Sequence, residues 1–129
     1  MLATPLAGLL YAAATGTLAQ HGPLRWRPGA AVGVVLASAG YPESSRSGDV
    51  ISGGALPGVI HAGTATDAQG RLVTAGGRVL CVTGTGDSLA DARDAAYRLV
   101  SEVSFAGRQF RTDIAARAAV GDVTLPTAG

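Results

Sequence analysis

Arg78 directly follows a pair of glycines, Gly76 and Gly77, and stands before an apolar run rich in β-branched residues. Glycines favour a tight turn and leave room for a ligand to approach the backbone, whereas the run at 79–83 favours a strand. The planar guanidinium group of arginine offers several donors that match a carboxylate or a phosphate group. The sequence therefore predicts a turn and a strand that present an anion-binding arginine, with a solvent-exposed loop charge as the alternative.

A second turn with a chemically useful side chain follows the apolar run at 30–38, where Gly40, Tyr41 and Pro42 interrupt regular structure. Such a break can hold Tyr41 outward from the strand that precedes it. The tyrosine then either covers the edge of the core or contacts a ligand, and we favour the cover.

For the other residues that could carry out chemistry, we expect structural roles. His21 and His61 have no cysteine, aspartate or further histidine at a ligand-like spacing, so we expect both to be structural. Cys81 is the single cysteine and lies in an apolar run, which favours a small buried hydrophobe. The loop 84–87 lacks the third glycine and the Lys-Ser/Thr of phosphate-binding motifs, and we interpret it as a strand-to-helix turn. We predict no catalytic residue and no metal ligand.

Length and composition indicate one packed domain. The chain has 129 residues, of which 47% are hydrophobic and 15% charged, a balance typical of globular proteins. Its 19 glycines and 5% aromatic residues favour short strands and tight turns. The net charge of +1 is spread along the chain without a basic cluster, which argues against nucleic acid as a partner. No signal peptide and no membrane-spanning stretch is evident, so we expect a cytoplasmic protein without a membrane partner.

The start of the chain predicts a helix over 5–16, with Thr4 as its N-cap, Pro5 in its first turn and Gly16 at its end. No charged side chain precedes Arg25, so this helix has apolar surface to bury on more than one side. Either it packs into the core of this domain, or the neighbour that covers it is missing.

The rest of the chain predicts an α+β fold. The helix is the clearest element, because apolar residues recur at helical spacing over 88–103 and Ser88 with Asp91 approximates a capping box. The strand at 30–38 is apolar enough to be buried on both faces. The other expected segments are strands at 49–52, 58–64, 71–74 and 78–83, a hairpin turn at 67–70, an extended segment at 105–111, a helical turn at 112–117 and a frayed tail from Gly121. Together they predict a small mixed or antiparallel β-sheet, or a barrel-like domain, with one main amphipathic helix and an N-terminal helix.

Six blocks, in this order and spacing, resemble the C-terminal domain of phosphoribosylamine–glycine ligase, an ATP-grasp ligase also called glycinamide ribonucleotide synthetase. The blocks are residues 34–42, 48–51, 61–64, 76–83, the helix at 88–103 and residues 110–114. The resemblance runs from about Leu6 to Ala118. It implies that residues 1–20 are a helix leaving the ATP-grasp domain, 21–120 the C-terminal ligase domain and 121–129 a flexible tail.

The resemblance also implies an activity. The family uses ATP, with Mg or Mn, to activate glycine as an acyl phosphate, which the amine of 5-phosphoribosylamine attacks in purine biosynthesis. The ATP-binding lysines and the metal-holding residues of the family have no counterparts here, and the chain contains no lysine. We therefore expect a fragment that is inactive alone, that binds no cofactor itself, and whose partner is the missing N-terminal and ATP-grasp portion.

By the same resemblance the turn 76–78 faces the substrate cleft, and Arg78 binds the phosphate of the ribosyl substrate. The turn 40–42 matches a second loop near that cleft. Ser45 and Ser47 stand where the family often has an aromatic residue and a lysine, so the sequence departs from the family pattern in this loop.

Two alternatives remain open at this point. One is a free-standing β-rich binding module, and the other is the C-terminal domain of a different ATP-grasp ligase. A biotinyl or lipoyl carrier is excluded because it needs a lysine. An exposed apolar patch on the first helix would count against the free-standing module, and a buried first helix would support it.

Overall fold

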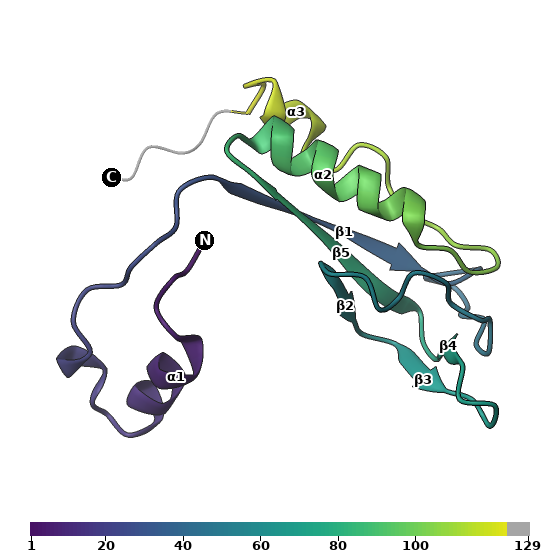
Figure 1. Ribbon diagram of the computed structural model, residues 1–129, viewed down its shortest axis with the longest axis horizontal. Helices are drawn as coiled ribbons and strands as arrows, with labels where there is room; N and C mark the ends of the chain where they lie inside the picture. The colour runs from purple at the N-terminus through teal and green to yellow at the C-terminus, as the bar shows by residue number, and fades with distance from the viewer. Residues whose placement is uncertain (124–129) are drawn as a thin grey trace.

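The fold is a three-stranded antiparallel sheet with one long helix on one of its faces (Figure 1). The computed structural model describes residues 1–123. In chain order the elements are α1 (Leu6–Ala14), the 3₁₀ helix η1 (Leu18–Gln20), β1 (Ala30–Ala37), β2 (Val59–His61), β3 (Thr64–Thr66), β4 (Leu72–Thr74), β5 (Arg78–Gly86), α2 (Leu89–Glu102) and α3 (Ala116–Ala119). The sheet order is β1-β5-β2, and β3 and β4 form a separate hairpin. The α+β prediction is confirmed, and the sheet is antiparallel.

The helix α2 and the central strand β5 form the core. Ala92, Ala96 and Val100 of α2 are buried against Val34 of β1 and Val82 of β5, and all five side chains are at most 2% exposed. The predicted helix at 88–103 is confirmed within one residue at each end. Its predicted capping box is also present: the amide of Asp91 donates to Ser88 Oγ, and the amide of Ser88 donates to the Asp91 carboxylate.

The capping box makes stability depend on pH. Hydrogen bonds from the side chain and backbone of Ser88 lower the pKa of Asp91 below its ordinary value of 3.8. Its contribution is therefore fully present above that value and is lost as the pH falls through the folded-state pKa. We expect Asp91→Asn to lower the urea midpoint at pH 7 and to flatten its decline between pH 5 and pH 2. Asp94→Asn, on the same helix, is the control because Asp94 accepts no hydrogen bond in the described structure; equal effects would contradict the role of the cap.

The prediction that β1 is buried on both faces is wrong. Burial alternates along the strand, so that Val34 and Leu36 are completely buried while Val35 remains 45% exposed. The reason is that α2 covers only one face of the sheet. A continuous apolar run cannot reveal whether a second layer is present.

Three other expectations differ from the structure. Residues 49–52 form only isolated bridges, in which Val50 pairs with Val73 and Ser52 with Ser104. The strand expected at 58–64 is divided into β2 and the start of β3, because the chain bends between them after β2 has paired with β5. The glycines at 84 and 86 are not a strand-to-helix turn but the last part of β5. The hairpin turn at 67–70 is confirmed between β3 and β4.

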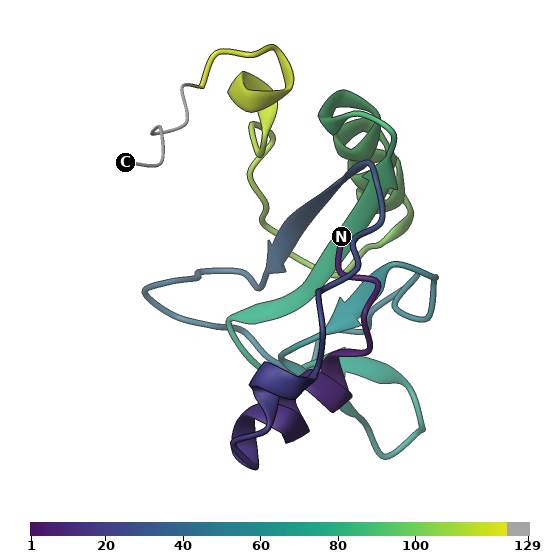
Figure 2. The same ribbon diagram turned by 90° about the vertical axis from the view of Figure 1, so that its left-hand side faces the viewer.

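The first 28 residues form a unit that stands away from the sheet (Figures 1 and 2). Thr4 is not the N-cap of α1: Pro5 takes that position, while Thr4 Oγ1 accepts a 2.7 Å hydrogen bond from the amide of Arg25. Gly16 has a φ of 70° after the helix, as predicted. Within α1 only Leu9 and Ala12 are buried, so this helix does not pack into the core of the domain.

The C-terminal part follows α2 back along the molecule. The predicted helical turn at 112–117 is α3 instead, which begins at Ala116 because Ala115 adopts a left-handed φ of 58°. In the predicted tail, Asp122 accepts a hydrogen bond from Arg117, and residues 124–129 lie outside the described residues. Within residues 1–123, every helix is too short or too polar to span a bilayer.

Candidate functional site

The two loops singled out from the sequence meet at one end of the sheet. The amide of Ser38 donates a 2.8 Å hydrogen bond to the carbonyl of Gly77. The Tyr41 ring occupies the space beside Gly77, where a Cβ atom would lie 2.4 Å from the ring. The structure thus brings the turn 40–42 and the turn 76–78 into direct contact, and this contact requires a glycine at position 77.

A pocket of about 600 Å³ lies between these loops on the face of the sheet that α2 does not cover. Val35 of β1 and Cys81 of β5 line its base, and Tyr41, Gly77 and Arg78 line its rim. The base is apolar and the rim carries the one charged side chain that lines this pocket. Such a pocket can hold a small ligand that combines a compact body with an anionic group.

Arg78 is exposed, and its guanidinium group makes no hydrogen bond or ion pair with any of residues 1–123. Five other arginines each pair with an aspartate: Arg46, Arg71, Arg93, Arg111 and Arg117. The amides of Gly76 and Gly77 also donate to no acceptor in the described part of the chain. Consecutive free amides beside a free guanidinium group are the donor set that binds phosphate or carboxylate.

Hydrogen bonds between Thr74 and the segment 48–49 hold the base of the site in place. The amide of Gly48 donates to the Thr74 carbonyl at 2.7 Å, and the amide of Asp49 donates to Thr74 Oγ1 at 3.1 Å. The buried Asp49 carboxylate pairs with Arg46 at 2.9 Å. These contacts fasten the segment after Pro42 to the residue that begins the turn 75–78. Ser45 and Ser47 are exposed and line neither this pocket nor its neighbour.

A second pocket of about 360 Å³ adjoins the first and shares Val35 and Tyr41 with it. Gln109, Phe110 and Arg111 line its other side. The residues at 109–111 were not predicted as part of a site, although 110–114 form one of the blocks that carry the family resemblance. The charge of Arg111 is already countered by Asp113, whose carboxylate accepts from the guanidinium group and raises the pKa of Arg111.

The histidines and the cysteine take the following places. His61 Nε2 lies 2.9 Å from the Gly54 carbonyl and Nδ1 lies 3.0 Å from Thr64 Oγ1, so the imidazole is hydrogen-bonded on both sides and carries a proton on Nε2. His21 is exposed in the N-terminal unit and lines neither pocket. Cys81 is half-buried and lines the larger pocket, so the expectation of a buried hydrophobe is wrong. Alternation along β5 turns Val82 to the core and Cys81 to the open face.

The contact between Tyr41 and Gly77 can be tested directly. Gly77→Ala should destabilise the chain by about 1–3 kcal/mol, because the new methyl group overlaps the tyrosine ring. Tyr41→Ala in the same chain should recover most of that loss, since the ring is the obstacle. Urea unfolding of the wild type, both single variants and the double variant measures the coupling free energy. Additive effects would show that the two turns are not coupled through this contact.

The fold and the site define a class: a small α+β domain with a pocket on the uncovered face of its sheet, and a separate, largely apolar N-terminal helix that stands away from the sheet. The family model described as "Phosphoribosylglycinamide synthetase, C domain" matches residues 31–117. This match covers most of the chain, and the chain belongs to this family.

The chain is also similar to curated proteins named phosphoribosylamine–glycine ligase. The relative from Mycobacterium tuberculosis is 50% identical over 125 residues, which are 97% of this chain and 30% of the relative. The relative from Streptomyces coelicolor is 53% identical over 126 residues, which cover 92% of this chain and 30% of the relative. The crystal structure of the ligase from Thermotoga maritima superposes with a TM-score of 0.67 at 39% identity, over 83% of this chain and 27% of that chain. The chain thus spans about 30% of the length of the relatives.

These findings bear on the two alternatives. The matched family is the one that the six sequence blocks resemble, so the C-terminal domain of a different ATP-grasp ligase is no longer needed as an explanation. In α1, Leu6, Leu10 and Tyr11 are 58–72% exposed. This exposed apolar surface is the observation that counts against a free-standing module.

Proposed function

We propose that this chain acts as the C-terminal part of a phosphoribosylamine–glycine ligase, which joins glycine to 5-phosphoribosylamine as ATP is hydrolysed to ADP and phosphate. The observation that carries the proposal is the unpaired Arg78 on the rim of a pocket that is formed by three of the family blocks. In this role the chain closes the substrate cleft from the side of its uncovered sheet face.

The residues of this chain bind and orient a substrate. Arg78 and the amides of Gly76 and Gly77 hold the phosphate of 5-phosphoribosylamine, and the pocket beside them receives the ribosyl group. Tyr41 packs on Gly77 and keeps the turn in place. The substrate amine is thereby directed out of the pocket, toward the glycyl phosphate that glycine and ATP form. Its nitrogen lone pair attacks the acyl carbon to make the amide bond, the bond from that carbon to the phosphate oxygen breaks, and the nitrogen gives up a proton as inorganic phosphate leaves. Holding the two reactants in position is a large part of such catalysis.

We assign ATP and its magnesium or manganese ion to the remaining part of the ligase. Within residues 1–123, His, Cys, Asp and Glu side chains nowhere gather in threes close enough to hold a metal ion. The described residues therefore do not fit a metal-nucleotide site. A ligase of purine biosynthesis uses the nucleotide pool of the cell, and we propose the cytoplasm as its location.

A mixing assay tests the proposal. The chain is incubated with glycine, 5-phosphoribosylamine and Mg-ATP, alone and together with the Mycobacterium tuberculosis relative from which the matching segment has been removed. We expect ADP and glycinamide ribonucleotide to form only in the mixture. Absence of product, when both pieces are folded and co-elute in gel filtration, would contradict the proposal and favour a binding module.

A further inference from the structure

Two exposed apolar surfaces lie on the same side of the sheet, opposite α2. The first, which we call the helix patch, consists of Leu6, Leu10 and Tyr11 of α1. The second, which we call the sheet row, runs across three strands: Cys81 of β5 is paired with Val35 of β1 on one side and with Ile60 of β2 on the other. Val35 and Ile60 are 45% and 57% exposed, far more than strand residues of a finished core.

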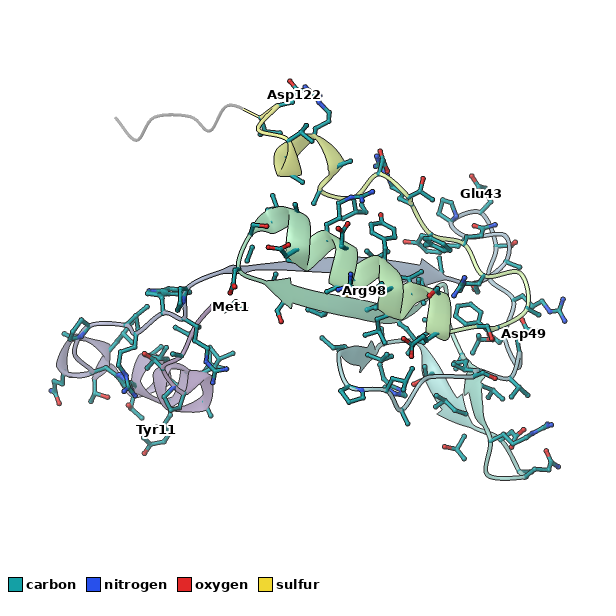
Figure 3. All side chains as sticks on the ribbon, turned by 45° about the horizontal axis from the view of Figure 1, so that its top comes forward. Met1, Tyr11, Glu43, Asp49, Arg98 and Asp122 are labelled. Carbon is teal, nitrogen blue, oxygen red and sulfur yellow. The ribbon has the colours of Figure 1, made fainter. Side chains whose placement is uncertain are left out.

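The spatial relation of the two surfaces is seen in two views at right angles. In both, α2 lies above the sheet and α1 below it (Figures 1 and 2). Tyr11 points away from the sheet into solvent (Figure 3). The N-terminal unit is closed on itself by hydrogen bonds, such as that from the amide of Arg27 to the carbonyl of Met1 at 2.7 Å. These backbone contacts hold the N-terminal unit together, and the apolar surface of α1 stays exposed.

The comparisons indicate what covers these surfaces. The C-domain family model begins at residue 31, whereas the ligase relatives align with 97% of the chain and so extend into the N-terminal unit. Most of residues 1–30 are therefore shared with the ligases although they lie outside the C-domain model. The remaining 70% or so of the length of the relatives has no counterpart in the chain. The sequence carries no charged side chain before Arg25, so α1 itself has none, which suits an apolar contact rather than a network of ion pairs.

We propose that the helix patch and the sheet row are two parts of one docking surface for the remaining portion of the ligase. This inference rests on the proposed function and adds to it the surface through which the partner binds. A partner that reaches both parts covers Cys81 and supplies the wall that the larger pocket lacks on its open side. The substrate site is then completed at the same contact that joins the two portions.

Cys81 reports on docking because it belongs to the sheet row and is the single cysteine of the chain. Iodoacetamide labelling is followed by mass spectrometry of the tryptic peptide 79–93, with and without the trimmed Mycobacterium tuberculosis relative. We expect the partner to slow the alkylation of Cys81 at least 10-fold. Unchanged labelling in a mixture whose two pieces co-elute would overturn the proposal, whether or not the mixture makes product.

Substitutions separate the docking surface from the rest of the exterior. Ile60→Asp and Leu10→Asp should each weaken binding of the partner roughly 10- to 100-fold, because each introduces a charge into an apolar contact. Val120→Asp is the matched control, since Val120 is 80% exposed and directly follows α3, the helix that contacts α2. Sedimentation velocity with a labelled partner measures the three affinities. Equal affinities for all three variants would overturn the proposal, and so would a second copy of the chain protecting Cys81 at micromolar concentration.

A single-chain form covers the case in which the trimmed relative does not fold. There, residues 1–129 replace the matching segment of the relative, and Cys81 labelling in this chimaera is compared with labelling in the isolated chain. We expect the same 10-fold protection, and reversal by Ile60→Asp. Protection without activity would keep the docking surface and reject the ligase function, whereas activity without protection would do the reverse.

Discussion

Arg78→Ala is expected to raise the KM for 5-phosphoribosylamine roughly 10- to 100-fold in the assembled ligase, with little change in the folding of the chain. Hydrogen bonds to a charged group contribute about 1.5–3 kcal/mol, and each 1.4 kcal/mol corresponds to a factor of ten. Arg78 makes no side-chain hydrogen bond or ion pair with residues 1–123, so its removal breaks no contact that stabilises the fold. Arg78→Lys should recover only part of the affinity, because an ammonium group keeps the charge but not the planar fork of donors.

The control for this prediction is Arg98→Ala. Arg98 is an exposed arginine of α2, on the opposite side of the sheet from the pocket, and its loss changes the net charge by the same amount (Figure 3). Steady-state kinetics with varied 5-phosphoribosylamine, together with inhibition by ribose 5-phosphate, measures both variants. Ribose 5-phosphate should inhibit the wild type and the Arg98 variant, and should inhibit the Arg78 variant far more weakly. Equal KM values for the two variants would show that Arg78 does not bind the substrate phosphate.

The elements that depend on neighbouring residues were predictable from the sequence. The helix α2 is specified by apolar spacing and by the reciprocal hydrogen bonds of Ser88 and Asp91, all within one or two turns. The hairpin between β3 and β4 is likewise local: Asp67 accepts from the amides of Gln69 and Arg71 and fixes the turn. Such signals act within about four residues, and pattern analysis can detect them.

The predictions that failed concern contacts between segments that are distant in the sequence. The apolar run of β1 looks the same whether one face or two are covered, so the exposure of Val35 could not be predicted. The pocket depends on the contact between Tyr41 and Gly77, residues that are distant in sequence, and only the family resemblance placed both turns near one cleft. The contribution of Gln109, Phe110 and Arg111 was missed for the same reason. The block at 110–114 could have pointed to these residues. It belongs to the family resemblance, yet no local structural role accounts for it.

Gly84 is another residue whose role depends on a contact between segments distant in sequence. Local sequence rules assign this glycine to a turn, whereas the structure places it in a strand against a helix. It lies in β5, where α2 crosses the sheet at the small side chains of Ala92 and Ala96. A Cβ atom at Gly84 would lie 2.1 Å from the backbone nitrogen of Ala96 and 2.4 Å from the carbonyl oxygen of Ala92. Both are backbone atoms of the helix, so no rotation of a side chain can relieve the overlap.

Gly84→Ala is therefore expected to destabilise the chain by about 3 kcal/mol, at the upper end of the usual cost of overpacking. The helix would have to move away from the sheet as a body, which would loosen its packing on Val34 and Val82. Gly33→Ala is the control within the same sheet: Gly33 is paired with Thr83, and its new Cβ would meet only Cys81 Sγ, at 3.2 Å. Urea unfolding should place the Gly33 variant within about 0.5 kcal/mol of the wild type. Similar losses for both variants would mean that general strand propensity, and not the close approach of α2, explains the glycine in β5.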